Sequence, residues 1–183
     1  RFRNESPTVL AGPYTTYIWH PSQGDKIDVA GNSDHYQAGY FNTPYTTVGA
    51  EPEKQNIKST LSETVLDNDA SITKICPTFD NVHFLNDAKE LWSIGFNTTR
   101  KLGNGTTSHS AVPVQPIYED SPLENIELVA GGRYHTLAVD VHNRLFAWGN
   151  PAMHGSMIRT NGNAAGANHL YQATPYNYAS NHK

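Results

Sequence analysis

Histidine is the residue type in this sequence with the widest capacity for chemistry, because nine copies occur among 183 residues. Zinc sites in proteins use histidines at fixed short spacings, such as two histidines separated by three residues on one helix face. No pair has such a spacing, so we expect neither metal ligands nor cofactor-binding residues among His20, His35, His83, His109, His135, His142, His154, His169 and His182.

Acidic side chains are a second candidate, since two carboxylates placed across a glycosidic bond can hydrolyse it. Two groups of acidic residues occur, and both fall in segments that we expect to connect strands. We therefore predict solvated loop charge rather than catalytic residues for Glu63, Asp67 and Asp69 in the first group and Glu119, Asp120 and Glu124 in the second.

No nucleophile has the sequence context of a catalytic one. The motif G-x-S-x-G is absent, and Cys76, which is the one cysteine, has no histidine pairing that indicates a thiol enzyme. We expect Cys76 to be a small buried hydrophobic residue. The glycine-rich residues 103–108 lack the lysine of a phosphate-binding loop, so they indicate turns. The sequence thus predicts no enzyme and no catalytic residue.

The composition favours a sheet-rich protein. Charged residues make up 16% of the chain, and ten tyrosines are present. The net charge of −4, without a cluster of lysine and arginine, argues against nucleic acid as a partner. No apolar run approaches the ~18 residues of a membrane span. The single cysteine favours an intracellular setting. A first residue Arg1 is compatible with removal of a targeting segment from an organellar, for example mitochondrial, protein.

A unit of about fifty residues recurs along the chain. The two later copies, aligned on Gly95 and Gly149, match without a gap. An earlier and weaker copy is anchored on Gly31. Matching its Ala-Gly pair at residues 11–12 with the pair at 130–131 requires one inserted residue. The sequence therefore predicts about three repeats of one structural unit.

The last unit contains three short segments with the alternation of β-strands, at residues 126–130, 134–139 and 145–148. Three or four such strands per unit are typical of a β-propeller blade. Trp148 is expected to pack between neighbouring blades. We predict that residues 56–68, the one stretch with helical character, form a connecting loop with one helical turn.

At these residues the chain resembles the repeats of the regulator of chromosome condensation family. The family unit reads approximately V-A-A-G-x-x-H-T-L-A-L, then G-x-L-Y-x-W-G, then N-x-x-G-Q-L-G-x-G. The third copy supplies Val129-Ala130-Gly131, His135-Thr136-Leu137-Ala138-Val139 and Leu145-Phe146-Ala147-Trp148-Gly149-Asn150, and the middle copy supplies Leu91-Trp92-Ser93-Ile94-Gly95, Asn97 and Leu102-Gly103-Asn104-Gly105. The resemblance implies that His135 packs and forms hydrogen bonds near the inner strand of its blade.

The chain also departs from the family pattern. Cys76-Pro77 stands where small residues and glycine are expected, and Asn81-Val82 replaces His-Thr. The third copy lacks G-Q-L-G after Asn150, so we expect an unusual edge and a partner contact there. The family normally closes a seven-bladed ring, whereas this chain has material for about three blades. The resemblance therefore implies an all-β, partial or open propeller of four-stranded antiparallel sheets.

The repeats divide the chain, as one array over residues 1–183, into consecutive segments. We predict a weak blade-like repeat at 8–52, a connecting insertion at 53–71, repeats at 72–121 and 122–176, and a polar tail at 177–183.

An incomplete ring leaves sheet edges and blade faces uncovered, so it needs something to cover them. We therefore expect a non-enzymatic protein-interaction module or scaffold, either a subunit or a segment of a larger complex, whose partners are proteins. Two alternatives stay open. Some family members act as guanine-nucleotide exchange factors, although no residue here can be matched to that surface. A carbohydrate-binding or hydrolytic propeller is the other.

Overall fold

The computed structural model describes residues 6–31, 55–56, 61, 64–149 and 171–173. Within these residues the regular structure is β-strand apart from a turn of helix at Leu61 and two short 3-10 turns, η1 (Pro21–Gln23) and η2 (Asp67–Asp69). The all-β prediction is therefore confirmed. The expected edge at residues 150–155 lies outside the described residues.

The strands form three four-stranded antiparallel sheets, in each of which strands pair in chain order. Sheet 1 contains β1 (Thr8–Ala11), β2 (Thr15–His20), β3 (Lys26–Gly31) and β4 (Gln55–Asn56). Sheet 2 contains β5 (Ile72–Pro77), β6 (Asn81–Asn86), β7 (Leu91–Gly95) and β8 (Ser110–Val114). Sheet 3 contains β11 (Ile126–Gly131), β12 (His135–Asp140), β13 (Leu145–Gly149) and β14 (Tyr171–Ala173). The small hairpin of β9 (Ile117–Tyr118) and β10 (Ser121–Pro122) lies between sheets 2 and 3 in the chain.

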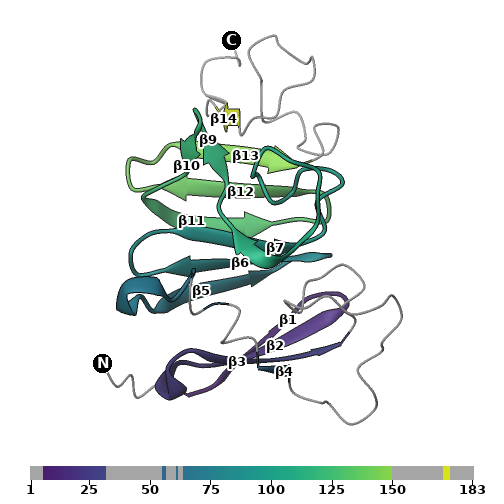
Figure 1. The fold of residues 1–183 in the computed structure, drawn as a ribbon, viewed down its shortest axis with the longest axis vertical. Helices are drawn as coiled ribbons and strands as arrows, with labels where there is room; N and C mark the ends of the chain where they lie inside the picture. Colours follow the sequence, from purple (N-terminus) through teal and green to yellow (C-terminus); the bar gives the residue numbers. More distant parts are fainter. Residues whose placement is uncertain (1–5, 32–54, 57–60, 62–63, 150–170, 174–183) are drawn as a thin grey trace, which may run out of the picture.

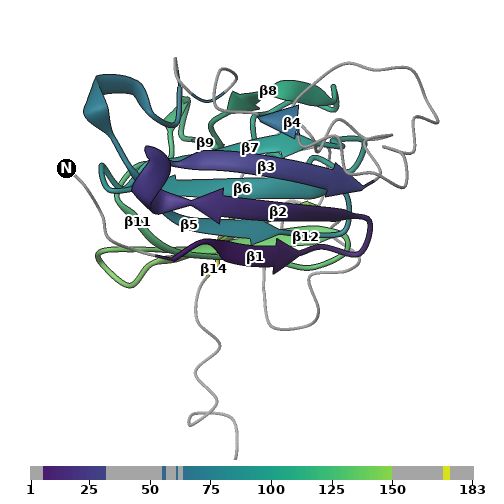
Figure 2. The same ribbon diagram turned by 90° about the horizontal axis from the view of Figure 1, so that it is seen from below.

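The three sheets are stacked face against face in chain order, as Figure 1 shows from sheet 1 in purple to sheet 3 in green. The first strands β1, β5 and β11 contact one another from sheet to sheet, so they form the inner side of the stack. Seen from below, sheet 1 lies over sheet 2 (Figure 2). Stacked four-stranded meanders with their first strands innermost are the arrangement of consecutive propeller blades.

The burial of the second strands reflects the position of each sheet in the stack. All six residues of β6 are buried, because sheet 2 is covered on both faces. In β12 buried and half-buried residues alternate, since one face of sheet 3 packs on sheet 2 and the other does not. Sheet 2 is therefore the centre of the described fold.

Two apolar cores hold the stack together, one at each interface between sheets. The core between sheets 1 and 2 contains Tyr17, Ile27, Val29, Leu61, Val65, Ile72, Ile75, Val82, Phe84 and Ile94. The core between sheets 2 and 3 contains Leu85, Leu91, Leu123, Ile126, Val129, Ala138, Phe146 and Trp148. Burial of this apolar surface is the main source of stability at both interfaces.

A glycine ends the third strand of every sheet. Gly31, Gly95 and Gly149 have φ angles of 117°, 119° and 111°, which side chains with a Cβ rarely adopt. At each position an added Cβ would lie only 2.3 or 2.4 Å from the carbonyl oxygen of the turn before the second strand. The three glycines that align the repeats in the sequence are thus the same structural position in each sheet.

The alignment of the first repeat needs a correction. Ala11 pairs with Thr16 in sheet 1 as Gly131 pairs with Thr136 in sheet 3, so Ala11 corresponds to Gly131 rather than to Ala130. The hairpin between β2 and β3 is two residues longer than its counterparts in sheets 2 and 3, not one. The extra residues form η1, whose Pro21 fits the first position of a helical turn.

The turns between the second and third strands share a polar clamp in sheets 2 and 3. The side-chain oxygen of Asn86 accepts a hydrogen bond from the Glu90 N–H at 2.9 Å, and that of Asp140 accepts one from the Arg144 N–H at 2.8 Å. Burial alone would raise the pKa of Asp140, but the hydrogen bonds from Arg144 and His142 outweigh it and lower that pKa.

The predicted connecting loop contributes to the core. Leu61 and Val65 are fully buried between sheets 1 and 2, and the Leu66 N–H donates to the Leu61 carbonyl at 3.0 Å in a single turn. The Asn86 side chain donates to the Val65 carbonyl at 3.0 Å. The sequence indicated the turn but not this packing role.

Sheet 1 is also tied to sheet 2 by Asp25, which lies in the longer hairpin and is buried. Its carboxylate accepts hydrogen bonds from the Trp19 indole at 2.8 Å and from the Ile72 backbone N–H at 3.1 Å. This contact lies at the end of the stack that carries the turns between second and third strands.

Replacing Gly95 by alanine is expected to destabilise the chain by roughly 3 kcal/mol, because the new Cβ meets the Asp80 carbonyl in a strained backbone region. Gly24 is the control, since it has a φ of 67° in an exposed turn. Gly24→Ala is expected to lose only ~1 kcal/mol from left-handed strain. Urea unfolding measures both. Equal losses would contradict the close-packed position of Gly95.

Candidate functional site

The turns between first and second strands gather at one end of the stack. Their backbone hydrogen bonds are equivalent in the three sheets: Gly12 N–H to the Thr15 carbonyl at 2.8 Å, Thr78 to Asn81 at 2.8 Å, and Gly132 to His135 at 2.9 Å. The loop after β7 reaches the same end, because the Phe96 N–H donates to the Asp80 carbonyl at 3.0 Å. We call residues 12–15, 78–81, 95–109 and 132–135 the turn face.

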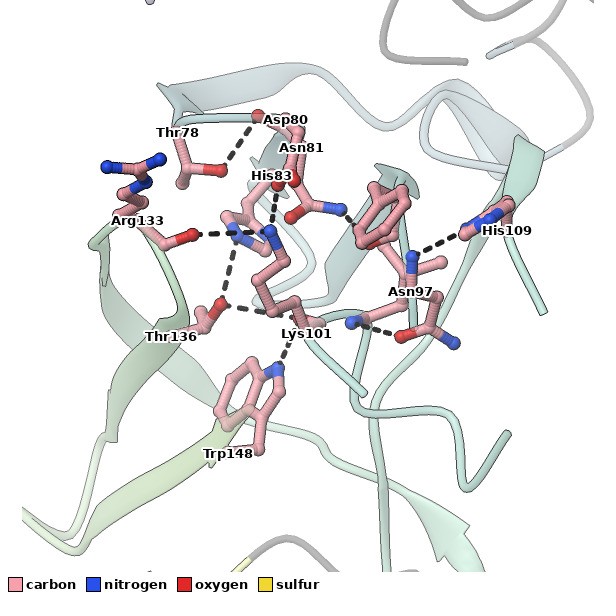
Figure 3. A network of polar contacts seen from close by, with 12 residues as sticks. Thr78, Asp80, Asn81, His83, Asn97, Lys101, His109, Arg133, Thr136 and Trp148 are labelled. Atoms are coloured by element: carbon pink, nitrogen blue, oxygen red, sulfur yellow. Dashed lines mark hydrogen bonds and ion pairs between the residues drawn. The ribbon is translucent and has the colours of Figure 1, made fainter. Parts of the chain in front are cut away.

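Lys101 is the centre of a polar junction between sheets 2 and 3 on this face (Figure 3). The side chain is only 2% exposed. Its ammonium forms an ion pair with Asp80 and donates to the Arg133 carbonyl at 3.2 Å. Burial lowers the pKa of Lys101, and the carboxylate of Asp80 opposes that shift.

The backbone of Lys101 binds sheet 3 as well. Its carbonyl accepts hydrogen bonds from the Thr136 hydroxyl at 3.3 Å and from the Trp148 indole N–H at 2.7 Å. The indole therefore links the loop of one sheet to the third strand of the next, which confirms that Trp148 packs between blades.

His83 extends the junction into the interior of sheet 2. Its ring is fully buried, with Nδ1 at 2.7 Å from the Ser93 hydroxyl and Nε2 at 3.2 Å from the Thr136 hydroxyl. Since the Thr136 hydroxyl donates to Lys101, the network assigns the ring proton to Nε2, which donates to Thr136. Burial and then the charge of Lys101 lower the pKa of His83 to about 3, so the ring is neutral at pH 7.

The loop at residues 95–109 is shaped by Asn97. Its side-chain oxygen accepts from the Leu102 N–H at 2.9 Å, and its side-chain nitrogen donates to the Thr106 carbonyl at 2.9 Å. Gly103 follows with a φ of 72°, and a Cβ there would lie 2.9 Å from the Trp148 indole nitrogen. The glycine therefore makes room for the tryptophan of the next sheet.

A row of aromatic rings and one arginine crosses the turn face. The Tyr14 ring meets the Phe79 ring edge-on, with centroids 4.9 Å apart. The Arg133 guanidinium lies 4.3 Å from the centroid of Phe79 and 5.0 Å from that of Tyr134. We call these four residues the aromatic–arginine row. It spans the turns of all three sheets.

The arrangement separates buried from accessible groups. Lys101 and His83 are enclosed, so neither can meet a substrate. No cluster of three or more histidine, cysteine or acidic residues in the described part of the chain could hold a metal ion. The aromatic–arginine row is among the groups in contact with solvent, with Arg133 and Tyr14 exposed, as is His109 in the loop after β7.

Comparison with known proteins matches residues 90–139 to the regulator of chromosome condensation (RCC1) repeat. Residues 90–139 are thus similar to one RCC1 repeat. The matched residues run from β7 of sheet 2 to β12 of sheet 3, so the repeat includes Lys101, Arg133 and Thr136 of the junction.

Solved structures with RCC1-type propellers have the same fold. Human WBSCR16 matches with a TM-score of 0.64 at 20% identity, covering 79% of this chain and 34% of WBSCR16. Prp20p from Saccharomyces cerevisiae matches with a TM-score of 0.57 at 16% identity, and the match covers 78% of this chain and 32% of Prp20p. Yeast RCC1 (Prp20) bound to Kap60 matches with a TM-score of 0.56 at 18% identity, and the match covers 78% of this chain and 31% of yeast RCC1. The chain spans about a third of the length of these proteins, and it has the fold of a propeller fragment.

His83, Thr136 and Trp148 belong to the polar junction, and the other residues considered from the sequence lie away from it or at its rim. Among the carboxylates, Asp67, Asp69, Glu119, Asp120 and Glu124 are all exposed, and Glu63 lies outside the described residues, as do His154 and His169. His135 is half-buried at the start of β12, opposite Gly149. Cys76 is only half-buried and borders the second core, and burial raises the pKa of its thiol.

Sequence reasoning did not single out Lys101, Asp80 or Arg133, and it considered His83 only as one of nine histidines without the spacing of metal ligands. The available signal was the position of Lys101 directly before the Leu102-Gly103 pair of the RCC1 repeat. A lysine in a glycine-rich loop is normally solvated, so this position alone did not indicate burial.

Lys101→Met is expected to destabilise the chain by about 3 kcal/mol, since it leaves the Asp80 carboxylate buried without its cation. Asp80→Asn should have a similar effect for the reciprocal reason. The double variant should lose less than the sum of the two, because neither charge is then left alone. Urea unfolding of the four proteins measures the coupling. Additive losses would contradict a buried ion pair.

The stability of the chain should depend on pH through His83. The unfolded ring binds a proton below pH ~6.5, whereas the folded ring does so only near pH 3. Stability is therefore complete above pH ~6.5 and falls as the pH decreases, by up to ~1.4 kcal/mol per pH unit. Urea midpoints measured from pH 7 to pH 4 should decrease more steeply for the wild type than for His83→Gln. Parallel curves would contradict a neutral, buried histidine.

Proposed function

We propose that this chain is a non-enzymatic protein-interaction module that supplies three blades of an RCC1-type propeller within a larger assembly. The proposal rests on the face of sheet 3 that points away from sheet 2, which we call the outer face. The partners are proteins, and the first of them is a further blade of the same kind.

The outer face of sheet 3 is aliphatic. The cross-strand pairs Leu128–Val139 and Val139–Leu145 place three aliphatic residues in one row across β11, β12 and β13. A second row contains Ala130, Leu137 and Ala147, of which Ala147 is already fully buried. Leu128 is 54% exposed, which is unusual for a leucine in the first strand of a sheet.

The equivalent positions of sheet 2 indicate what belongs on this face. Leu85 and Leu91 correspond to Val139 and Leu145, and both are buried against sheet 3. The same row in sheet 2 is thus covered by the following sheet. A further blade would bury the row of sheet 3 in the same way, and each buried leucine side chain contributes about 2 kcal/mol.

The solved relatives support this proposal by their length, because the match covers only 34% of WBSCR16 and 32% of Prp20p. Prp20p is described with its binding to Gsp1p and histones, and yeast RCC1 is described bound to Kap60. Protein partners are therefore the class that we propose for this chain. In the part that the structure describes, no helix has the length and apolar character needed to span a membrane.

Leu128→Glu should uncouple the outer face from partners without unfolding the chain. The 183-residue chain is expected to bind a hydrophobic dye and to self-associate, and the variant should weaken both several-fold. Val112→Glu is the matched control, since Val112 is 52% exposed on β8 and outside this face. Fluorescence titration and sedimentation velocity measure the two properties.

Two results would overturn the proposal. One is a monomeric wild-type chain that binds no dye. The other is acceleration of nucleotide release from a small GTPase by this chain, which would favour the exchange-factor alternative.

A further inference from the structure

The charged residues of the described chain are distributed unequally between the two ends of the stack. On the turn face lie Arg100, Lys101 and Arg133, and the one described carboxylate there, Asp80, is neutralised by Lys101. The other end carries most of the acidic residues, namely Asp25, Asp28, Asp67, Asp69, Asp87, Glu90, Glu127 and Asp140, with Lys26, Lys89 and Arg144. The turn face is therefore positive although the chain as a whole has a net charge of −4.

Arg133 is the cation of this face that remains available. Its guanidinium contacts Phe79 and Tyr134 through their ring faces and has no hydrogen bond or ion pair in the described part of the chain. Figure 3 shows its carbonyl directed to Lys101 and its guanidinium directed away from the junction. The buried ion pair of Lys101 and Asp80 therefore leaves the charge of Arg133 uncompensated.

The position of Arg133 is held before any ligand binds. Its carbonyl accepts a hydrogen bond from Lys101, and its guanidinium carbon lies over the rings of Phe79 and Tyr134. A guanidinium stacked on rings keeps its N–H edge free, and that edge matches the two oxygens of a carboxylate. Since the side chain is already ordered, binding loses less rotamer entropy than it would with a free arginine.

We propose that the aromatic–arginine row binds an acidic segment of a protein, with Arg133 receiving a carboxylate and Tyr14 and Phe79 contacting the neighbouring side chains. Tyr14 is 48% exposed at the sheet 1 end of the row, where it extends the contact surface. This inference rests on the proposed function, because it names the chemistry of a partner for the same module. A nucleic acid is the less favoured occupant, since phosphate backbones require several accessible cations.

The proposal is tested by titrating the full chain with a fluorescein-labelled peptide of alternating glutamate and glycine, followed by fluorescence anisotropy. Arg133→Glu is expected to weaken binding at least tenfold. Arg133→Lys should weaken it about threefold, since the charge stays but the planar fork is lost. Phe79→Leu should also weaken binding, because it removes the ring that holds the guanidinium while keeping an apolar side chain.

Lys89→Glu provides the matched control. It makes the same change of charge at the other end of the stack, where Lys89 is exposed and pairs with Glu127, and it should leave binding unchanged. Thermal unfolding of each variant checks the fold. If Arg133→Glu is unstable, Arg133→Gln gives the same comparison with a smaller change of charge.

Three outcomes would overturn the proposal. They are no binding of the glutamate peptide, equal binding by Arg133→Glu and the wild type, and tighter Arg133-dependent binding of a thymidine oligonucleotide of the same length. Dye binding and self-association depend on Leu128 on the outer face of sheet 3, whereas peptide binding depends on Arg133 on the turn face. If the peptide does not bind but Leu128-dependent association persists, only the acidic-segment proposal fails and the interaction module remains.

Discussion

A buried ammonium group between the second and third sheets constrains this structure more than any other single group. Transferring the charge of Lys101 out of water is unfavourable unless partners surround it, and Asp80 together with the Arg133 carbonyl supplies them. Asp80 belongs to sheet 2, like Lys101, whereas the Arg133 carbonyl belongs to sheet 3, so the ammonium has its full set of partners only when the two sheets are stacked in one register. The Lys101 carbonyl imposes a second condition, because Thr136 and Trp148 must both reach it. Apolar packing alone would tolerate small slips between sheets, whereas this junction does not.

The repeated positions of the fold could be predicted from the sequence because they depend on local backbone geometry. A positive φ at the end of each third strand requires glycine, so Gly31, Gly95 and Gly149 are visible as a pattern. The Trp148 contact could be predicted for a related reason, since the Gly103 that makes room for it belongs to the same motif. The longer hairpin of sheet 1 was misjudged by one residue, because Pro21 and its turn have no counterpart in the other repeats.

The junction itself could not be predicted, because its members are far apart in the sequence and each is individually ordinary. Asp80 and Lys101 are in different loops, and His83 meets Thr136 only after two sheets pack together. Nothing local distinguishes a lysine that will be buried from one that stays in solvent. The aromatic–arginine row on the turn face could not be predicted for the same reason. Tyr14 and Tyr134 occupy the same position of their turns, and Phe79 occupies the position of Arg133, but a repeat alignment alone does not show that these rings and the guanidinium meet across three sheets.

The two interfaces of the stack differ in what holds them. Sheet 1 meets sheet 2 mainly through apolar side chains and the Asp25 contact at one end, while sheet 3 meets sheet 2 through apolar side chains and a network of buried polar groups. Apolar attraction weakens on cooling, whereas a buried network that includes a neutral histidine weakens in acid. Cold would therefore loosen the first sheet before the third, and acid would loosen the third before the first. Temperature and acidity thus act on opposite ends of the same short arc.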